Sequence, residues 1–161
     1  MSAVLAFNVN GTPGAQGSKR HVGHGVMVES SKKVKPWRQD VKAAAEHATG
    51  NVGHFDEWTP FDGPVHATIV FRFPRPKGHY RTGRNAHLLR YNAPAFPTSR
   101  QLGDVDKLVR STFDALTAAG VVTDDSLFAR LYTVKTWCEP GETPGASIMV
   151  RPLTRPAQAV A

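Results

Sequence analysis

Four aspartates bracket one amphipathic segment of this sequence. Asp104 and Asp106 flank a single residue at its start, and Asp124 and Asp125 follow its end. Hard divalent cations such as Mg²⁺ take oxygen ligands, often one or two carboxylates together with water and a substrate phosphate. Carboxylates gathered without a cation repel one another and raise each other's pKa. The pattern therefore indicates a candidate metal site, where a bound ion can activate water against a phosphodiester.

The same residue types also suit a purely structural role, because Asp is common at helix N-caps and in turns. Asp104 would then cap a helix, and "TDDS" at 123–126 would form a solvated turn. A helix of about fifteen residues spans roughly 22 Å, so its two ends are too far apart to share an ion directly. Either the strand expected at 127–136 turns back beside the helix start, or a second copy of the chain brings its own acids close.

The order of helices and strands expected around these residues predicts an α+β fold, in which a mixed sheet packs with two helices. One helix is expected at 35–48, and the second runs from an N-cap at Asp104 to a C-terminal glycine at Gly120. The last two strands are expected to pair as a hairpin around "CEPGETPG". Strands are expected at 3–9, 64–73, 127–136 and 145–153, with a possible short strand at 26–29.

The length of 161 residues suits a single domain, expected over 1–155 with a frayed tail at 156–161. The sequence has no run of about 18 apolar residues and no signal-peptide pattern, so a cytoplasmic protein without membrane association is expected. The single cysteine, Cys138, excludes an internal disulfide, and the seven histidines show no zinc-binding spacing. No P-loop or GxGxxG motif opens a helix after a strand, so no small-molecule cofactor is expected.

The charge of the chain favours a polyanionic partner such as nucleic acid. The formal net charge is +7 and the pI is about 9.9. Residues 63–103 contain no Asp or Glu but seven Lys and Arg. Within this stretch, residues 74–103 are expected to form a thirty-residue basic loop, and loops of this length in compact domains are usually functional. A loop that only solubilises the protein is the alternative.

The run "DVDKLVRSTFDALTAAGVVTDDS" at 104–126 resembles the core motif of the RusA family of Holliday junction resolvases. That motif is written D-x-D-N-L-x-K, followed by D-A-L and then by a D-D pair, and the spacing here matches without a gap. The early strand, the basic glycine-rich arm, the helix near "KPWRQDV" and a late strand with a lysine are also similar. The resemblance implies a homodimeric, Mg²⁺-dependent endonuclease, bacterial or phage-encoded, in which Mn²⁺ can substitute. Such an enzyme makes paired nicks across four-way junctions in DNA recombination and repair.

By motif position, the resemblance implies that Asp104, Asp106 and Asp125 are metal-binding catalytic acids, with Asp124 as an adjacent candidate ligand. Lys107 stands where the family motif usually has Asn. Together these positions define the expected catalytic centre.

Arg110 stands where the family motif has a lysine. Its guanidinium keeps the positive charge and can bind phosphate bidentately, but its very high pKa excludes any step that needs proton transfer. Lys135, in the strand at 127–136, either faces the site and stabilises phosphate charge together with Arg110 or is a solvated strand residue. Asp114 lies on the polar helix face and is expected to pair with Arg110 rather than bind metal.

Contacts with the DNA backbone are expected from the basic arm before the first helix and from the basic loop. Such contacts carry little sequence information, so the shape of the junction should dominate selection. A homodimer is expected because its two-fold symmetry would match that of a four-way junction. The strands at 64–73 and 127–136 lend modest support, since they carry more apolar residues than one helix pair can cover. The candidate DNA-binding residues are Lys19, Arg20, Lys32, Lys33, Arg75, Lys77, Arg81 and Arg84.

Two other classes of protein fit the charge: a catalytically inactive DNA-binding protein and an RNA-binding accessory protein. A pure binder gains nothing from acids placed beside phosphate. The sequence also lacks an RNP-like aromatic motif of RNA-binding domains. The endonuclease is therefore the function that we expect.

Overall fold

The computed structural model describes residues 4–17, 19–29, 31–50 and 58–154, and the tail expected at 156–161 lies outside them. A hairpin of two short strands precedes the first helix, and the basic loop separates the fourth strand from the second helix. The elements are β1 (Leu5–Asn10), β2 (Lys19–His21), β3 (Met27–Glu29), α1 (Val34–Gly50), β4 (Val65–Phe73), α2 (Val105–Ala118), β5 (Phe128–Trp137) and β6 (Gly145–Pro152).

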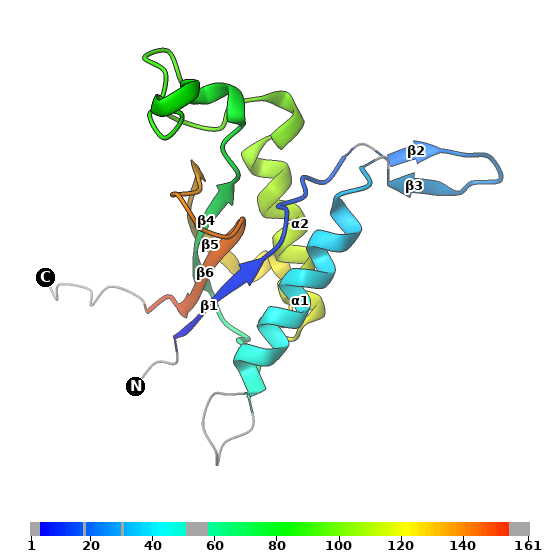
Figure 1. The fold of residues 1–161 in the computed structure, drawn as a ribbon. Helices are drawn as coiled ribbons and strands as arrows, with labels where there is room; N and C mark the ends of the chain where they lie inside the picture. Colours follow the sequence, from blue (N-terminus) through cyan, green and yellow to red (C-terminus); the bar gives the residue numbers. More distant parts are fainter. Residues whose placement is uncertain (1–3, 18, 30, 51–57, 155–161) are drawn as a thin grey trace, which may run out of the picture.

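A four-stranded sheet in the order β1-β6-β4-β5 forms one layer, and α1 and α2 lie side by side on one of its faces (Figure 1). β5 runs parallel to β4, whereas β6 is antiparallel to both β1 and β4. The β2–β3 hairpin projects from this body. The predicted single α+β domain with a mixed sheet and two helices is confirmed. Among the described residues, no helix is long and apolar enough to cross a membrane.

β4 lies inside the sheet, as its alternating apolar pattern predicts. Val65, Ile69 and Phe71 point toward the helices and are fully buried. Trp37 of α1 packs on this row, with its ring centroid 6.2 Å from that of Phe71. Val41, one turn further along α1, is also fully buried. The central strand and the amphipathic first helix thus form the middle of the core.

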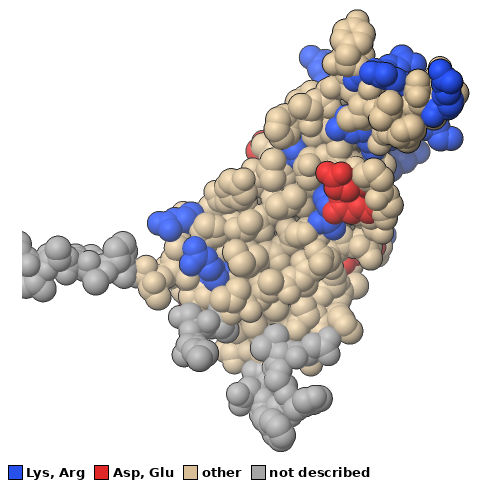
Figure 2. Space-filling model, turned by 60° about the vertical axis from the view of Figure 1, so that its left-hand side comes forward, with Lys and Arg blue, Asp and Glu red and all other residues tan. Residues whose placement is uncertain are grey.

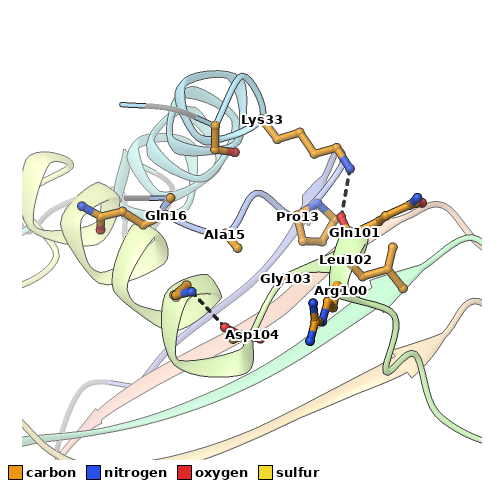
Figure 3. A pocket seen from close by; sticks show the side chains of 12 residues that line it. Pro13, Ala15, Gln16, Lys33, Arg100, Gln101, Leu102, Gly103 and Asp104 are labelled. Atoms are coloured by element: carbon orange, nitrogen blue, oxygen red, sulfur yellow. Dashed lines mark hydrogen bonds and ion pairs between the residues drawn. The ribbon is translucent and has the colours of Figure 1, made fainter. Parts of the chain in front are cut away.

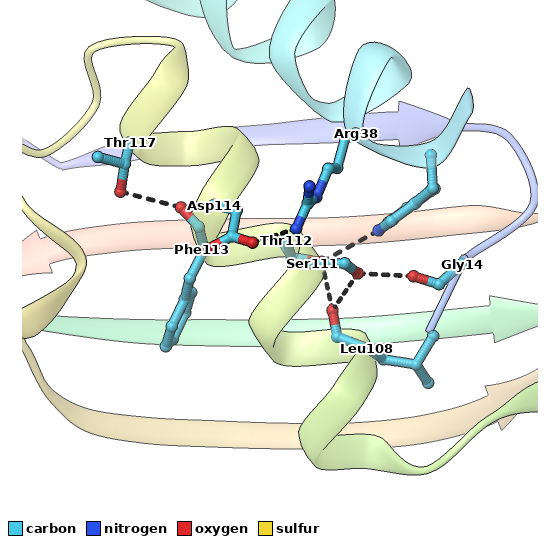
Figure 4. A network of polar contacts seen from close by, with 9 residues as sticks. Gly14, Arg38, Leu108, Ser111, Thr112, Phe113, Asp114 and Thr117 are labelled. Carbon is cyan, nitrogen blue, oxygen red and sulfur yellow. Dashed lines mark hydrogen bonds and ion pairs between the residues drawn. The ribbon is translucent and has the colours of Figure 1, made fainter. Parts of the chain in front are cut away.

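Buried hydroxyl groups fix α2 in place (Figure 4). Ser111 is fully buried, and its Oγ donates to the carbonyl of Gly14 at 2.6 Å. Thr112 is also fully buried, and its Oγ1 accepts the indole N–H of Trp37 at 3.1 Å. The position of α2, and with it the position of the acids at its start, is therefore tied to the segment after β1 and to α1.

The predicted pair between Asp114 and Arg110 is wrong. Asp114 pairs instead with Arg38 of α1, and both side chains are about one third exposed. Asp114 shares a hollow between the two helices with Ala115, Ala118 and Arg38, whereas Arg110 is exposed. An ion pair across the two helices replaces the expected pair along one helix.

The predicted hairpin between the last two strands is also wrong. β5 and β6 do not pair with each other, because β4 lies between them. Residues 138–144 carry the chain across the end of β4. This arrangement gives the most buried strand a hydrogen-bonded neighbour on each side, so its backbone N–H and C=O groups are satisfied without water.

The basic loop, residues 74–103, follows an ordered path. It contains short 3₁₀ helices at Lys77–His79, Gly83–Asn85 and Arg100–Leu102. An isolated antiparallel bridge joins Tyr80 to Leu89. Figure 2 shows Lys and Arg side chains gathered at the end of the molecule that this loop forms.

Candidate active site

The start of α2 is shaped by Gly103 and Asp104. Gly103 has a φ of 84°, and a Cβ at this position would overlap the side chain of Ala15, so both backbone and space require glycine. Asp104 occupies the N-cap position, but its carboxylate makes no capping hydrogen bond. It pairs with Lys107 Nζ at 2.9 Å instead, and the Asp104 side chain is 64% exposed. The predicted N-cap position of Asp104 is confirmed, but the capping hydrogen bond that the structural alternative requires is not present.

Positive charges surround the Asp104 carboxylate. The hydrogen bond and charge of Lys107 hold the pKa of Asp104 below its ordinary value, and the charges of Lys135 and Arg100 act in the same direction. Lys135 lies in β5 and donates from Nζ to the carbonyl of Gly103 at 2.8 Å. The structure thus places Lys135 beside the start of α2 and not in a solvated position along the strand.

A hollow of about 380 Å³ opens next to Asp104 (Figure 3). Its walls come from residues 13–17, the residues just before α1, the 3₁₀ helix Arg100–Leu102 and the start of α2. Lys33 reaches across one side and donates to the carbonyl of Gln101 at 3.3 Å. With Arg100 and Lys107 also in its walls, the hollow offers a cationic surface to a phosphate beside the Asp104 carboxylate.

The acids after α2 lie at the opposite end of that helix. The Asp124 carboxylate accepts the backbone N–H of Ser126 at 2.9 Å, which caps the 3₁₀ helix Asp125–Leu127. Hydrogen bonding to the side chain of Ser126, and then to its backbone, lowers the pKa of Asp124. Asp125 is exposed. Asp124 thus has the turn role that the structural alternative gave it, and Asp125 is the freer carboxylate of the two.

One chain does not assemble the expected four-acid site. Among the described residues, no group of three or more His, Cys, Asp or Glu side chains could hold a metal ion. β5 does turn back beside the start of α2, as one of the two routes requires, but it brings Lys135 there and leaves Asp125 at the far end. Of the two routes, only a second copy of the chain can unite these acids.

Asp106 and Arg110 are both exposed and lie one turn apart on α2. Lys107, at the position where the motif has Asn, is paired with Asp104. A guanidinium one turn from a carboxylate can reach a phosphate held near that carboxylate, and it can do so with two parallel N–H groups. The residues at the start of α2 therefore combine acids with cations that suit a phosphodiester.

The predicted DNA-binding cations lie in different parts of the structure. Lys77, Arg81 and Arg84 are exposed on the basic loop, and Lys32 and Lys33 are exposed just before α1. The side chains of Lys19 and Arg20 lie outside the described parts of the structure.

Arg75 differs from the other loop cations. Its guanidinium lies over the ring of Trp137, 5.1 Å from the centroid, and donates to the carbonyl of Pro94 at 2.9 Å. This side chain holds the loop to β5. Arg100, which lines the hollow beside Asp104, was missed as a site residue. Its place four residues before Asp104, in the basic stretch, was the available signal.

A basic α+β domain that presents carboxylates among cations at the start of a helix has the features of a protein that acts on nucleic acid phosphates. The family model for Endodeoxyribonuclease RusA matches residues 9–151, nearly the whole chain. The chain belongs to the RusA family, and membership implies a nuclease of the Holliday junction resolvase type that acts on branched DNA. A search of curated proteins found no significant match.

Proposed function

We propose that this protein is a structure-selective DNA endonuclease that resolves four-way junctions by paired phosphodiester cleavage in recombination or repair. The observation that carries the proposal is the Asp104 carboxylate, which stands at the start of α2 without a capping role and beside Lys135. An aspartate that served only as a cap would be bonded to the helix backbone. This carboxylate is exposed and paired with a flexible lysine side chain, which a bound cation would replace.

We propose Mg²⁺ as the cofactor, with Mn²⁺ as a substitute. Exposed carboxylate oxygens are the donors that Mg²⁺ prefers, and bound there the ion would lower the pKa of a water molecule and offset phosphate charge. The fourteen-residue helix α2 separates the two groups of acids by roughly 20 Å. Each site would therefore take Asp104 and Asp106 from one subunit and Asp125 from the other.

The exposed edge of β5 supports a two-fold arrangement of this kind. β5 is an outer strand of the sheet, and Leu131 and Tyr132 near its middle are 42% and 59% exposed. If β5 paired antiparallel with its copy, the beginning of each strand would lie beside the end of the other. Asp125 precedes the beginning of β5, and Lys135 near its end contacts Gly103. The pairing would bring Asp125 toward the partner's Asp104.

The cations of the chain would act on the phosphate rather than on protons. Lys135 and Arg110 would stabilise the charge that develops on the phosphate under attack. Arg110 would do so as a fixed bidentate donor, because its pKa is too high for proton transfer. Lys33 and Arg100, in the walls of the hollow, would hold a neighbouring phosphate of the same strand.

The proposal is tested with a four-way DNA junction, a linear duplex and an RNA hairpin, each incubated with Mg²⁺ or with EDTA. We expect cleavage of the junction, and only with Mg²⁺. Asp104→Asn and Asp125→Asn should each abolish cleavage and leave junction binding intact. Asp124→Asn is the matched control, because that carboxylate caps a turn, so the variant should be less stable but still cleave.

The outcomes separate the endonuclease from its two rivals. Binding of the junction without cleavage in any condition would identify an inactive DNA-binding protein. Preference for the RNA hairpin would identify an RNA-binding protein. Cleavage at the wild-type rate by both Asp104→Asn and Asp125→Asn would exclude the site proposed here.

A further inference from the structure

The basic loop carries an aromatic side chain that touches almost nothing in its own chain. Tyr91 is 98% exposed. Leu88, Leu89 and Phe96 in the same part of the loop are 41%, 42% and 59% exposed. Single exposed apolar residues are ordinary, but four within nine residues of one ordered loop form a surface that can bind a partner.

The segment that presents Tyr91 is held in shape by its own backbone. The N–H of Arg81 donates to the carbonyl of Leu88 at 2.8 Å, and the N–H of Arg90 donates to the carbonyl of His79 at 2.8 Å. The guanidinium of Arg90 adds a bond from Nε to the carbonyl of Tyr80 at 2.9 Å. Tyr91 therefore stands at a defined place before any ligand arrives.

Trp137 anchors the loop close to the proposed catalytic centre. Its indole N–H donates to the carbonyl of Pro94 at 2.9 Å, and the Arg75 guanidinium on its ring bonds the same carbonyl. Trp137 lies two residues after Lys135 on β5, and the loop is at the same end of the molecule as the start of α2 (Figure 1). A ligand on Tyr91 can thus belong to the same DNA molecule as the phosphate at Asp104.

The charge around Tyr91 selects a nucleic acid over a protein partner. Residues 63–103 contain no acid. Arg84 and Lys77 are exposed, and the structure shows no side-chain hydrogen bond or ion pair from either to any residue that it describes. An exposed aromatic ring and unpaired cations on one loop are the combination that binds single-stranded nucleic acid, where bases stack on the ring and phosphates meet the cations.

We propose that Tyr91 stacks on an unpaired base of branched DNA while Lys77 and Arg84 contact the adjoining phosphates. This inference rests on the proposed function. It adds that the loop recognises an unpaired base of the branched substrate. In a paired duplex both faces of each base are covered by neighbouring bases, so Tyr91 gains a partner only where stacking is broken. The loop would therefore favour DNA with an open branch point without reading its sequence.

The test measures binding in EDTA, where no cleavage is expected, to two DNAs that differ by one base. One is a fully paired duplex, and the other carries a single unpaired adenine in the same sequence. Tyr91→Leu should lose about tenfold in affinity for the DNA with the unpaired base, the size expected for one base–aromatic stack, and little for the paired duplex. Tyr91→Phe keeps the ring and should bind both DNAs like the wild type.

A spectroscopic readout distinguishes stacking from other contacts. With 2-aminopurine as the unpaired base, the wild type and Tyr91→Phe should change its emission on binding, and Tyr91→Leu should not. Equal weakening on both DNAs, or unchanged binding by Tyr91→Leu, would overturn the proposal. These binding measurements need neither metal nor cleavage, so they test the stacking role of Tyr91 separately from nuclease activity. The proposed nuclease activity fails only if the wild type cleaves no DNA with Mg²⁺.

Discussion

The ammonium group of Lys135 lies 2.8 Å from the carbonyl oxygen of Gly103, although the two residues are 32 positions apart. The bond joins the end of β5 to the residue before Asp104. It places a positive charge beside the carboxylate whose pKa it helps to lower. A lysine that serves both the shape and the charge of a site can be tested by separating the two roles.

Lys135→Met should lower the rate of junction cleavage at least tenfold at saturating protein, because it removes a charge that stabilises the phosphate under attack. Junction affinity, measured separately in EDTA, should change much less. Lys135→Arg keeps the charge and should recover part of the rate. If Lys135→Met cleaved at the wild-type rate once DNA was saturated, Lys135 would have no role in the chemical step.

Gly103→Ala should disturb the site through backbone strain and overlap with Ala15. We expect a loss of about 2–4 kcal/mol in the free energy of unfolding, together with a loss of cleavage. Gly83→Ala is the matched control, because Gly83 has a φ of 64° but nothing near its Cβ position. It should lose only about 1–2 kcal/mol and keep cleavage. Thermal unfolding that ranks the two variants equally would show that the Ala15 contact is unimportant.

Junction binding should weaken steeply with salt, because phosphate contacts release counterions. Lys77→Gln combined with Arg84→Gln should lower the slope of log affinity against log salt by about 2. Arg75→Gln should act differently, by lowering the melting temperature, since Arg75 holds Pro94 and Trp137. A slope that the double variant leaves unchanged would mean that the basic loop does not touch the DNA backbone.

Local sequence patterns predicted the elements but not how distant parts meet. The alternation of Val65 to Phe73 and the spacing of α2 predicted a buried strand and an amphipathic helix, and the structure has both. The hairpin expected from β5 and β6 failed because strand order depends on pairing with β4, which lies some sixty residues earlier. The sequences of two consecutive strands do not show whether a third strand lies between them in the sheet.

The candidate site shows the same division. The spacing of Asp104 and Asp106 was visible in the sequence, but the absence of a capping bond at Asp104 was not. Arg75 was predicted to contact DNA because its charge is evident in the sequence, whereas the position of Trp137 beneath its guanidinium depends on the fold. Asp114 was assigned the nearest cation along the helix, and its partner came from α1. In each case the residue type was informative, and its partner was set by tertiary packing.

The proposed pairing of β5 with its copy predicts a specific cross-link. In a Cys138→Ser background, Tyr132→Cys near the middle of β5 should form a disulfide between two copies, because a two-fold axis there brings equivalent residues together. Ala6→Cys is the control, since Ala6 is exposed on β1 at the opposite edge of the sheet. Without DNA, sedimentation equilibrium should give twice the 17.5 kDa chain mass. A monomer, or equal cross-linking by both variants, would contradict this interface.

Mixing two inactive variants tests whether each site is shared between subunits. If Asp104 comes from one subunit and Asp125 from the other, a dimer of Asp104→Asn with Asp125→Asn has both defects in one site and none in the second. Random mixing makes half of the dimers mixed, so about a quarter of the wild-type sites should be intact. Nicking by the mixture should therefore recover to about a quarter of the wild-type level, although each variant alone is inactive.

Sites built within single chains give the opposite result, because every site in the mixed dimer would then carry one defect. The control mixes Asp104→Asn with Asp106→Asn, whose acids lie on the same helix start and belong to the same half of each shared site. That mixture should stay inactive, because each site of the mixed dimer lacks one of the two acids. Recovery with Asp125→Asn but not with Asp106→Asn can arise only if Asp125 reaches across the interface to Asp104 of the partner subunit. Inactivity of both mixtures, in preparations shown to exchange subunits, would place all the acids of a site in one chain.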